Sequence, residues 1–189
     1  MAAFIEFLTQ YRNIPANDRA VLENGVQHRM VAAAEYLSPS GAVCRELFFI
    51  CHGVLRIVMQ NDKGNDITYH FVKENQLCTL LDSFTNNKPV PEGIQACCDS
   101  EVVAISRQNL HELYKKLPYF EAIIETVIKE GLLRKIEIQK LFHNEDASNR
   151  YRLFVQQHPD IALRVPLGDI ASYLRITPQS LSRIRKNRQ

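Results

Sequence analysis

The spacing of apolar residues changes twice along the 189 residues of the chain. Phe4, Ile5 and Leu8 follow the helical period, and Asn17 with Asp18 can cap a second short helix. Runs rich in β-branched and aromatic residues then cover residues 26–36, 46–51, 54–60, 67–72, 94–98 and 102–105. Gly, Asn and Pro separate these runs, which predicts an all-β barrel or sandwich with a hairpin turn at residues 61–65.

The helical period returns at Arg107 and predicts a short helix followed by a long one over residues 119–143. The apolar stripe of the long helix is too wide for a helix that covers a single surface. We therefore predict a dimerisation helix, and the alternative is a helix buried wholly within the monomer. The predicted dimer contacts are Phe120, Ile124, Val127 and Ile128.

The last stretch of the chain predicts two short helices joined by a tight turn. Ile170, Ala171 and Leu174 share one helical face, and Leu181 and Ile184 share another. Thr177 is a suitable N-cap, and Pro178 falls at the first helical position, where its missing N–H has no cost. The second helix carries basic and small polar residues on its outer face and no acid, which is typical of a DNA-binding helix-turn-helix. An ordinary helical hairpin with a solvated basic end is the alternative.

The charge distribution favours the nucleic-acid reading. Residues 150–189 hold eight basic and two acidic residues, whereas residues 1–149 hold 15 basic and 19 acidic residues. A basic module attached to an acidic body is typical of a nucleic-acid reader joined to another domain.

Composition argues against several other classes of protein. No apolar run is long enough to cross a bilayer, and the start of the sequence lacks the basic segment of a secretory signal, so we expect a cytoplasmic protein without a membrane partner. The five cysteines have no C-x-x-C spacing and indicate reduced, buried side chains rather than a metal site. The histidines form no catalytic or metal-ligand motif with other residues, so we expect no enzymatic activity.

The order of these elements resembles the Crp/Fnr family of bacterial transcription regulators. The resemblance covers nearly the whole chain and is most specific at residues 169–186, DIASYLRITPQSLSRIRK, and at residues 48–56, FFICHGVLR, which match a strand–Gly–strand segment. It implies an α+β protein with an N-terminal jelly-roll (double-stranded β-helix) sensor domain and long helix at residues 1–144, and a helix-turn-helix domain at residues 145–189 that lacks the usual wing. The implied partners are double-stranded DNA, a second copy of the chain and a small effector, and RNA polymerase is left open.

The resemblance also implies roles for single residues of the second short helix. By their match to the family motif, Gln179, Ser180 and Arg183 would contact base edges. Thr177, Arg185 and Lys186 would contact phosphates.

The cyclic nucleotide pocket of the family has an incomplete counterpart in this sequence. Members that bind cyclic AMP have a Gly-Glu pair, a Leu-Leu run and then an Arg that holds the cyclic phosphate. The corresponding positions here are Glu74, Leu80 and Leu81, and Lys88 is the sole cation of the following loop. Because no Arg lies between Arg56 and Arg107, we predict that the effector is not cyclic AMP. The alternative is a signalling module in which cyclic AMP controls DNA binding or another output.

Overall fold

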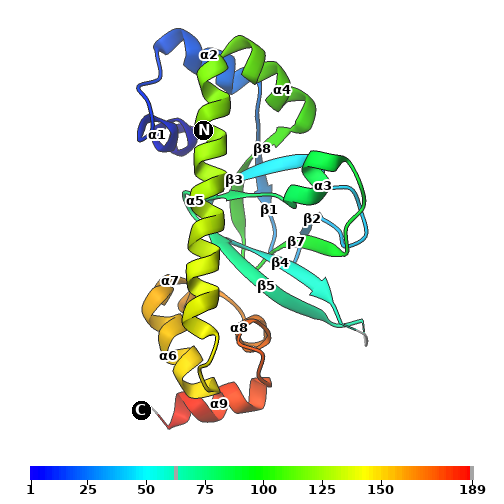
Figure 1. Cartoon of the computed structure of the whole chain (residues 1–189), viewed down its shortest axis with the longest axis vertical. Helices are drawn as coiled ribbons and strands as arrows, with labels where there is room; N and C mark the ends of the chain where they lie inside the picture. Colours follow the sequence, from blue (N-terminus) through cyan, green and yellow to red (C-terminus); the bar gives the residue numbers. More distant parts are fainter. Residues whose placement is uncertain (62–63, 188–189) are drawn as a thin grey trace.

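The structure is a computed structural model that describes residues 1–61 and 64–187. One long helix, α5 (Pro118–Phe142), runs beside two packed β-sheets and ends among the C-terminal helices (Figure 1). Pro118 occupies the first turn of α5, where its missing N–H breaks no hydrogen bond. This arrangement places the sheets against the upper part of α5 and the C-terminal helices at its lower end.

The strands of the described residues pair in two antiparallel four-stranded sheets that enclose one core. The first sheet has the order β1 (Gln27–Val31), β8 (Ser100–Ser106), β3 (Glu46–His52) and β6 (Leu77–Cys78). The second has the order β2 (Tyr36–Ser38), β7 (Glu92–Ala96), β4 (Val54–Gln60) and β5 (Asp66–Lys73). Phe48, Ile50, Leu55 and Ile94 are almost fully buried between the sheets. The result is the jelly-roll fold expected from the sequence, hereafter the β-roll.

Gly53 allows the chain to pass from the first sheet to the second between β3 and β4. Its φ is +100°, and a Cβ atom there would lie 2.7 Å from the Cβ of Ser100. Any other residue would therefore be strained and would collide with β8. The Gly of the strand–Gly–strand segment has a steric role.

Three helices close the upper end of the β-roll. They are α1 (Ala2–Thr9), α2 (Ala16–Asn24) and α4 (Arg107–Lys116). Phe4, Leu8, Leu22 and Leu110 of these helices join Phe120 of α5 in one buried cluster. A short helix, α3 (Leu81–Asn86), connects β6 to β7.

The C-terminal helices are α6 (Ala147–Gln157), α7 (Pro159–Arg164), α8 (Leu167–Tyr173) and α9 (Pro178–Lys186). Their buried residues include Phe154, Ile161, Ile170 and Leu181, and this cluster also takes in Phe71 of β5. The C-terminal helices therefore pack on the β-roll as well as on one another.

Most elements predicted from the sequence are present, but the strand β6 and the helix α7 were not predicted, and there are two further departures. The run at residues 26–36 is two strands, because Ala34 has a φ of +66° and its N–H donates to the carbonyl of Ala96. The helix α3 was not predicted. The predicted hairpin turn joins β4 to β5, with Asn61 N–H donating to Asn65 O at 3.0 Å, but residues 62 and 63 lie outside the described part.

Candidate DNA-binding surface and effector cavity

The turn between α8 and α9 has the local geometry of a helix-turn-helix. Thr177 Oγ1 accepts a hydrogen bond from Ser180 N–H at 3.1 Å and caps α9, and Pro178 follows at the first helical position. Arg175 lies in the left-handed region with a φ of +57°. A residue with a side chain costs about 1 kcal/mol in this region. Ala171 is fully buried where the two helices pack together.

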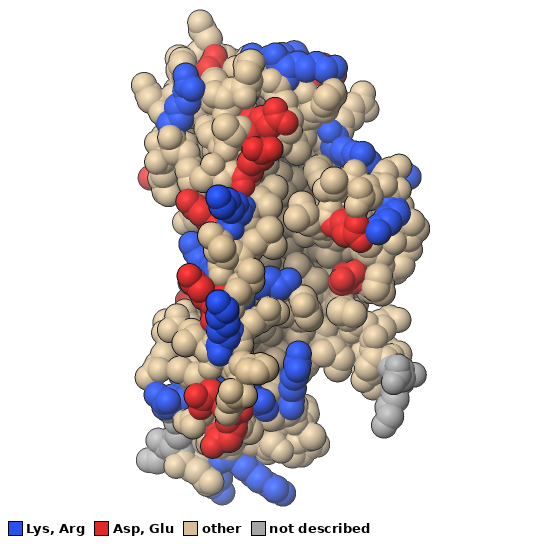
Figure 2. All heavy atoms as spheres, in the orientation of Figure 1, with Lys and Arg blue, Asp and Glu red and all other residues tan. Residues whose placement is uncertain are grey.

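The outer face of α9 is exposed and positively charged. Gln179, Arg183, Arg185 and Lys186 are exposed, and Arg183, Arg185 and Lys186 form no ion pair within the part of the chain that the structure describes. Ser180 is half-buried, and its hydroxyl lies 2.9 Å from Thr177 Oγ1. Lys and Arg side chains project from the lower end of the molecule, where α9 lies (Figure 2). This face can approach a polyanion without first breaking intramolecular ion pairs.

The first helix of the hairpin is bonded directly to the β-roll. Arg56 Nη1 donates to Asp169 Oδ1 at 2.6 Å, and the same guanidinium donates to Gln95 and Thr68. Ser172 Oγ accepts from the backbone N–H of Thr68 at 2.7 Å. Burial raises the pKa of the Asp169 carboxyl, and the charge of Arg56 opposes that rise in part.

A second set of ion pairs joins α7 to the end of β5. Arg164 donates from Nη1 and Nη2 to the two oxygens of Glu74, at 2.5 and 2.9 Å, and Lys73 Nζ lies 2.8 Å from Asp160 Oδ2. Glu74 also accepts from Gly53 N–H at 2.7 Å. Burial raises the pKa of Glu74, but the hydrogen bonds from Arg164 and Gly53 outweigh it and lower this pKa to about 2. Glu74 is therefore an ionised link between the β-roll and the C-terminal helices.

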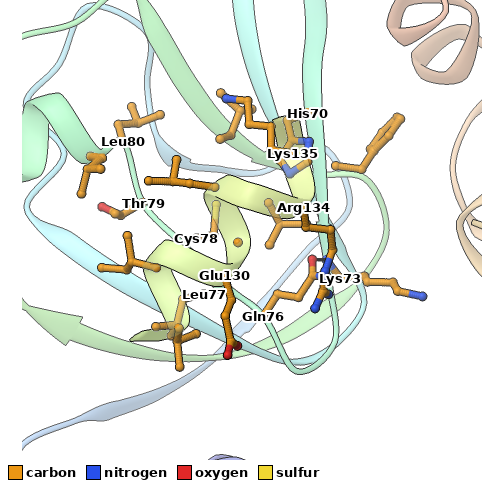
Figure 3. A pocket seen from close by; sticks show the side chains of 18 of the residues that line it. His70, Lys73, Gln76, Leu77, Cys78, Thr79, Leu80, Glu130, Arg134 and Lys135 are labelled. Carbon is orange, nitrogen blue, oxygen red and sulfur yellow. Dashed lines mark hydrogen bonds between the residues drawn. The ribbon is translucent and has the colours of Figure 1, made fainter. Parts of the chain in front are cut away.

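A cavity of about 250 Å³ lies between the β-roll, α5 and the α6–α7 junction (Figure 3). Its walls are mostly apolar, and Leu80 and Leu81 contribute to them as the sequence suggested. Glu74 and Lys88, the other two residues predicted for the effector pocket, do not line this cavity. Glu74 is bonded to Arg164, and Lys88 Nζ is bonded to Asp82 at 2.8 Å on the surface.

The polar residues that do line the cavity were missed from the sequence. Arg134 and Lys135 of α5 reach it, together with His70 of β5 and His158 at the α6–α7 junction. Burial lowers the pKa of His70 to about 4, with further lowering by Lys135 and His158. The adjacent basic pair within the apolar stripe of the long helix was the one available signal.

Comparison with known proteins was made for sequence and for structure. Residues 28–116 match the family model of the cyclic nucleotide-binding domain. No curated protein has a significantly similar sequence. The regulator CLP of Xanthomonas campestris, described as c-di-GMP responsive, aligns with a TM-score of 0.73 at 13% identity, over 92% of this chain and 91% of CLP.

Two further solved structures extend this likeness. FixK2 of Bradyrhizobium japonicum aligns with a TM-score of 0.72 at 14% identity, over 86% of this chain and 83% of FixK2. A putative regulator of the Crp/Fnr family from Eubacterium rectale aligns with a TM-score of 0.67 at 13% identity, over 96% of this chain and 87% of the other. The chain has the Crp/Fnr fold. The left-handed Arg175 and the surface ion pair of Lys88 are features of this chain within that fold.

The four residues predicted to contact a second copy pack instead against the β-roll of the same chain. Phe120 and Ile124 are at most 1% exposed, Val127 is buried, and Ile128 packs against the same cluster on the β-roll. The exposed apolar residues of α5 lie further along: Leu132, Leu133 and Ile136 are 45%, 51% and 47% exposed. Periodicity shows that a helix has two apolar faces but not which one meets the sheet.

No group of three or more His, Cys, Asp or Glu side chains in residues 1–61 and 64–187 is placed to hold a metal ion. None of the helices within those residues is long and apolar enough to cross a membrane. All five cysteines are free thiols.

Proposed function

We propose that this chain is a homodimeric, sequence-specific DNA-binding transcription regulator, with a sensor domain at residues 1–144 and a DNA-binding domain at residues 145–189. The exposed face of α9 carries the proposal. Gln179, Ser180 and Arg183 would contact base edges, and Thr177, Arg185 and Lys186 would contact phosphates. RNA polymerase is a further candidate partner, in keeping with a regulator of the cytoplasm rather than an enzyme.

An exposed apolar stripe on α5 supports the proposed dimerisation. Leu133 and Ile136 are three residues apart, and Leu132 and Ile136 are four apart, so the three share one face of the helix. A second copy packed on this stripe would bury it and would place two α9 helices on one duplex. Half-sites about one helical turn apart, ~34 Å, would match such a dimer.

Selection from a pool of random duplexes tests the proposal. The full chain should enrich one palindromic sequence, and the Gln179→Ala, Arg183→Ala double variant should enrich none. A Lys115→Ala variant is the control, because Lys115 lies on α4 and pairs with Glu112 at 2.9 Å. Equal recovery of all sequences by the wild-type chain would contradict sequence-specific binding.

Control by cyclic AMP is the second candidate function. The match of residues 28–116 to the cyclic nucleotide-binding domain favours it. Against it, the cation of the cassette loop, Lys88, is exposed and bonded to Asp82. Calorimetric titration with cyclic AMP distinguishes control by cyclic AMP from control by another effector. Tight binding supports the former, and absence of binding supports the latter.

A further inference from the structure

Basic and imidazole side chains line the cavity next to the C-terminal helices, and the carboxylates Asp82, Glu92 and Glu130 also belong to its lining. Lys73 and His70 reach it from β5, Arg134 and Lys135 from α5, and His158 from the α6–α7 junction. Lys73 is already paired with Asp160 at 2.8 Å. The remaining cations are therefore the two on α5.

Arg134 and Lys135 have no acidic partner in residues 1–61 and 64–187. Lys135 Nζ instead lies 4.4 Å from the centre of the Tyr69 ring, and Arg134 is exposed at the cavity mouth. Glu130, one helical turn before Arg134, accepts a hydrogen bond from the hydroxyl of Tyr11 at 2.8 Å. Asp82 is paired with Lys88, and neither Arg134 nor Lys135 forms an ion pair with the carboxylates that line the cavity, so both cations can contact an anion.

His158 supplies an independent observation at the same end. Its Nδ1 is buried and has no hydrogen-bond partner in the described part of the chain. Most buried polar atoms in folded proteins are paired, so an unpaired one beside a cavity is consistent with a missing ligand. Burial lowers the pKa of His158, with further lowering by Lys73, so its imidazole is neutral and retains one N–H donor at neutral pH.

The remaining walls limit what such a ligand can be. Leu77, Leu80, Val127 and Ile138 line the cavity with apolar groups. Its volume of about 250 Å³ is below the ~300–1,000 Å³ of pockets that hold drug-sized ligands. The cavity fits a compact body that is mostly apolar.

We propose that the cavity binds a small organic anion with an apolar body, whose carboxylate or phosphate head is held by Arg134 and Lys135 next to His158. The head group lies at the junction with the C-terminal helices, not in the loop that contains Lys88. Because His158 begins the segment that leads into α7, the ligand contacts the sensor and the DNA-binding helices together. This inference names the effector class of the proposed regulator and rests on that function for its biological meaning.

Hexanoate, hexyl phosphate and the uncharged hexanamide are suitable probes for titration calorimetry with the full chain. One or both anions should bind at least about tenfold more tightly than hexanamide, which corresponds to about 1.4 kcal/mol. The comparison of the two anions identifies the head group. Equal binding of an anion and hexanamide, or binding of none of the probes, would overturn the proposal.

Variants test the placement of the head group. The Arg134→Gln, Lys135→Gln double variant should lose about tenfold or more of the anion affinity. The matched control is Lys129→Gln with Lys140→Gln, on exposed positions of the same helix that do not line the cavity. All four positions are at the surface of α5 or the cavity mouth, so we expect both double variants to fold. Their unfolding temperatures check this. An equal loss of anion affinity in the two double variants would indicate a general electrostatic effect and would contradict a specific site.

Operator binding by the wild-type chain, measured without a probe, separates the two proposals. DNA binding without anion binding refutes the effector class and leaves the regulator intact. Anion binding without DNA binding refutes the regulator and leaves the anion site intact.

Discussion

Arg56 and Asp169 are joined at 2.6 Å across 113 residues of sequence, from the centre of the β-roll to the first helix of the helix-turn-helix. Asp169 is the sole acid of α8. Its partner is nearly buried and also donates to Gln95, so the guanidinium is held in place before α8 docks on it. The position of the C-terminal helices is therefore set in part by a residue of β4.

Asp169→Asn should loosen the C-terminal helices without unfolding the β-roll. The change leaves the charge of Arg56 without its carboxylate and should cost about 1–3 kcal/mol. Amide hydrogen exchange should quicken in α8 and α9 and stay unchanged in β3. Glu112→Gln, which removes an exposed pair with Lys115, is the control and should change neither. Uniform quickening in all three elements would show a general loss of stability instead.

Glu74→Gln should change how stability depends on pH. The folded pKa of Glu74 is about 2, below the usual 4.5, so its stabilisation is present above about pH 4.5 and disappears as the pH falls towards 2. After allowance for solvent screening, we expect a difference of about 1–2 kcal/mol between wild type and variant at neutral pH. Urea denaturation at several pH values should show this difference shrinking below about pH 4.5. A constant difference would mean that the ion pair with Arg164 is not its source.

If the proposed dimer forms through the exposed stripe of α5, Leu133→Glu with Ile136→Glu should convert it to a monomer with little effect on the fold. Both side chains are about half exposed, so a charge on each is tolerated in the monomer but not in an apolar contact between two copies. Sedimentation velocity measures the change. Leu163→Glu is the control, because Leu163 is 87% exposed on α7 and should leave the dimer intact. A wild-type chain that already sediments as a monomer would contradict this assignment.

Arg183→Ala and Lys186→Ala should weaken DNA binding in different ways. Arg183 is proposed to contact a base, so its loss should cost about 1–3 kcal/mol on the selected site and relax the preference at one position. Lys186 is assigned to a phosphate, so its loss should weaken all duplexes alike and lower the salt slope by about one unit. Affinities for selected and random duplexes at several salt concentrations measure both effects. Equal weakening by Arg183→Ala on the two duplexes would place this residue on the backbone.

The sequence was sufficient for the order of elements and insufficient for their contacts. Period, capping by Thr177 and the turn residues are local signals, and the structure has the corresponding helices and strands. The partner of each charged side chain depends instead on which segments meet in the folded chain. Glu74 and Lys88 align with a ligand cassette, yet their charges are used by Arg164 and Asp82, and nothing local in the sequence shows those partners.

Strand β5 lines the cavity and also contacts the C-terminal helices. Its His70 lines the cavity, whereas Phe71 lies 5.0 Å, centre to centre, from the ring of Tyr173 in α8. If the proposed effector and operator sites are coupled through this strand, the coupling is symmetric: the factor by which the effector changes operator affinity equals the factor by which the operator changes effector affinity. Copies bound to DNA would then hold the effector with a different strength from free copies, so the concentration at which the signal is read would depend on how much operator is already occupied.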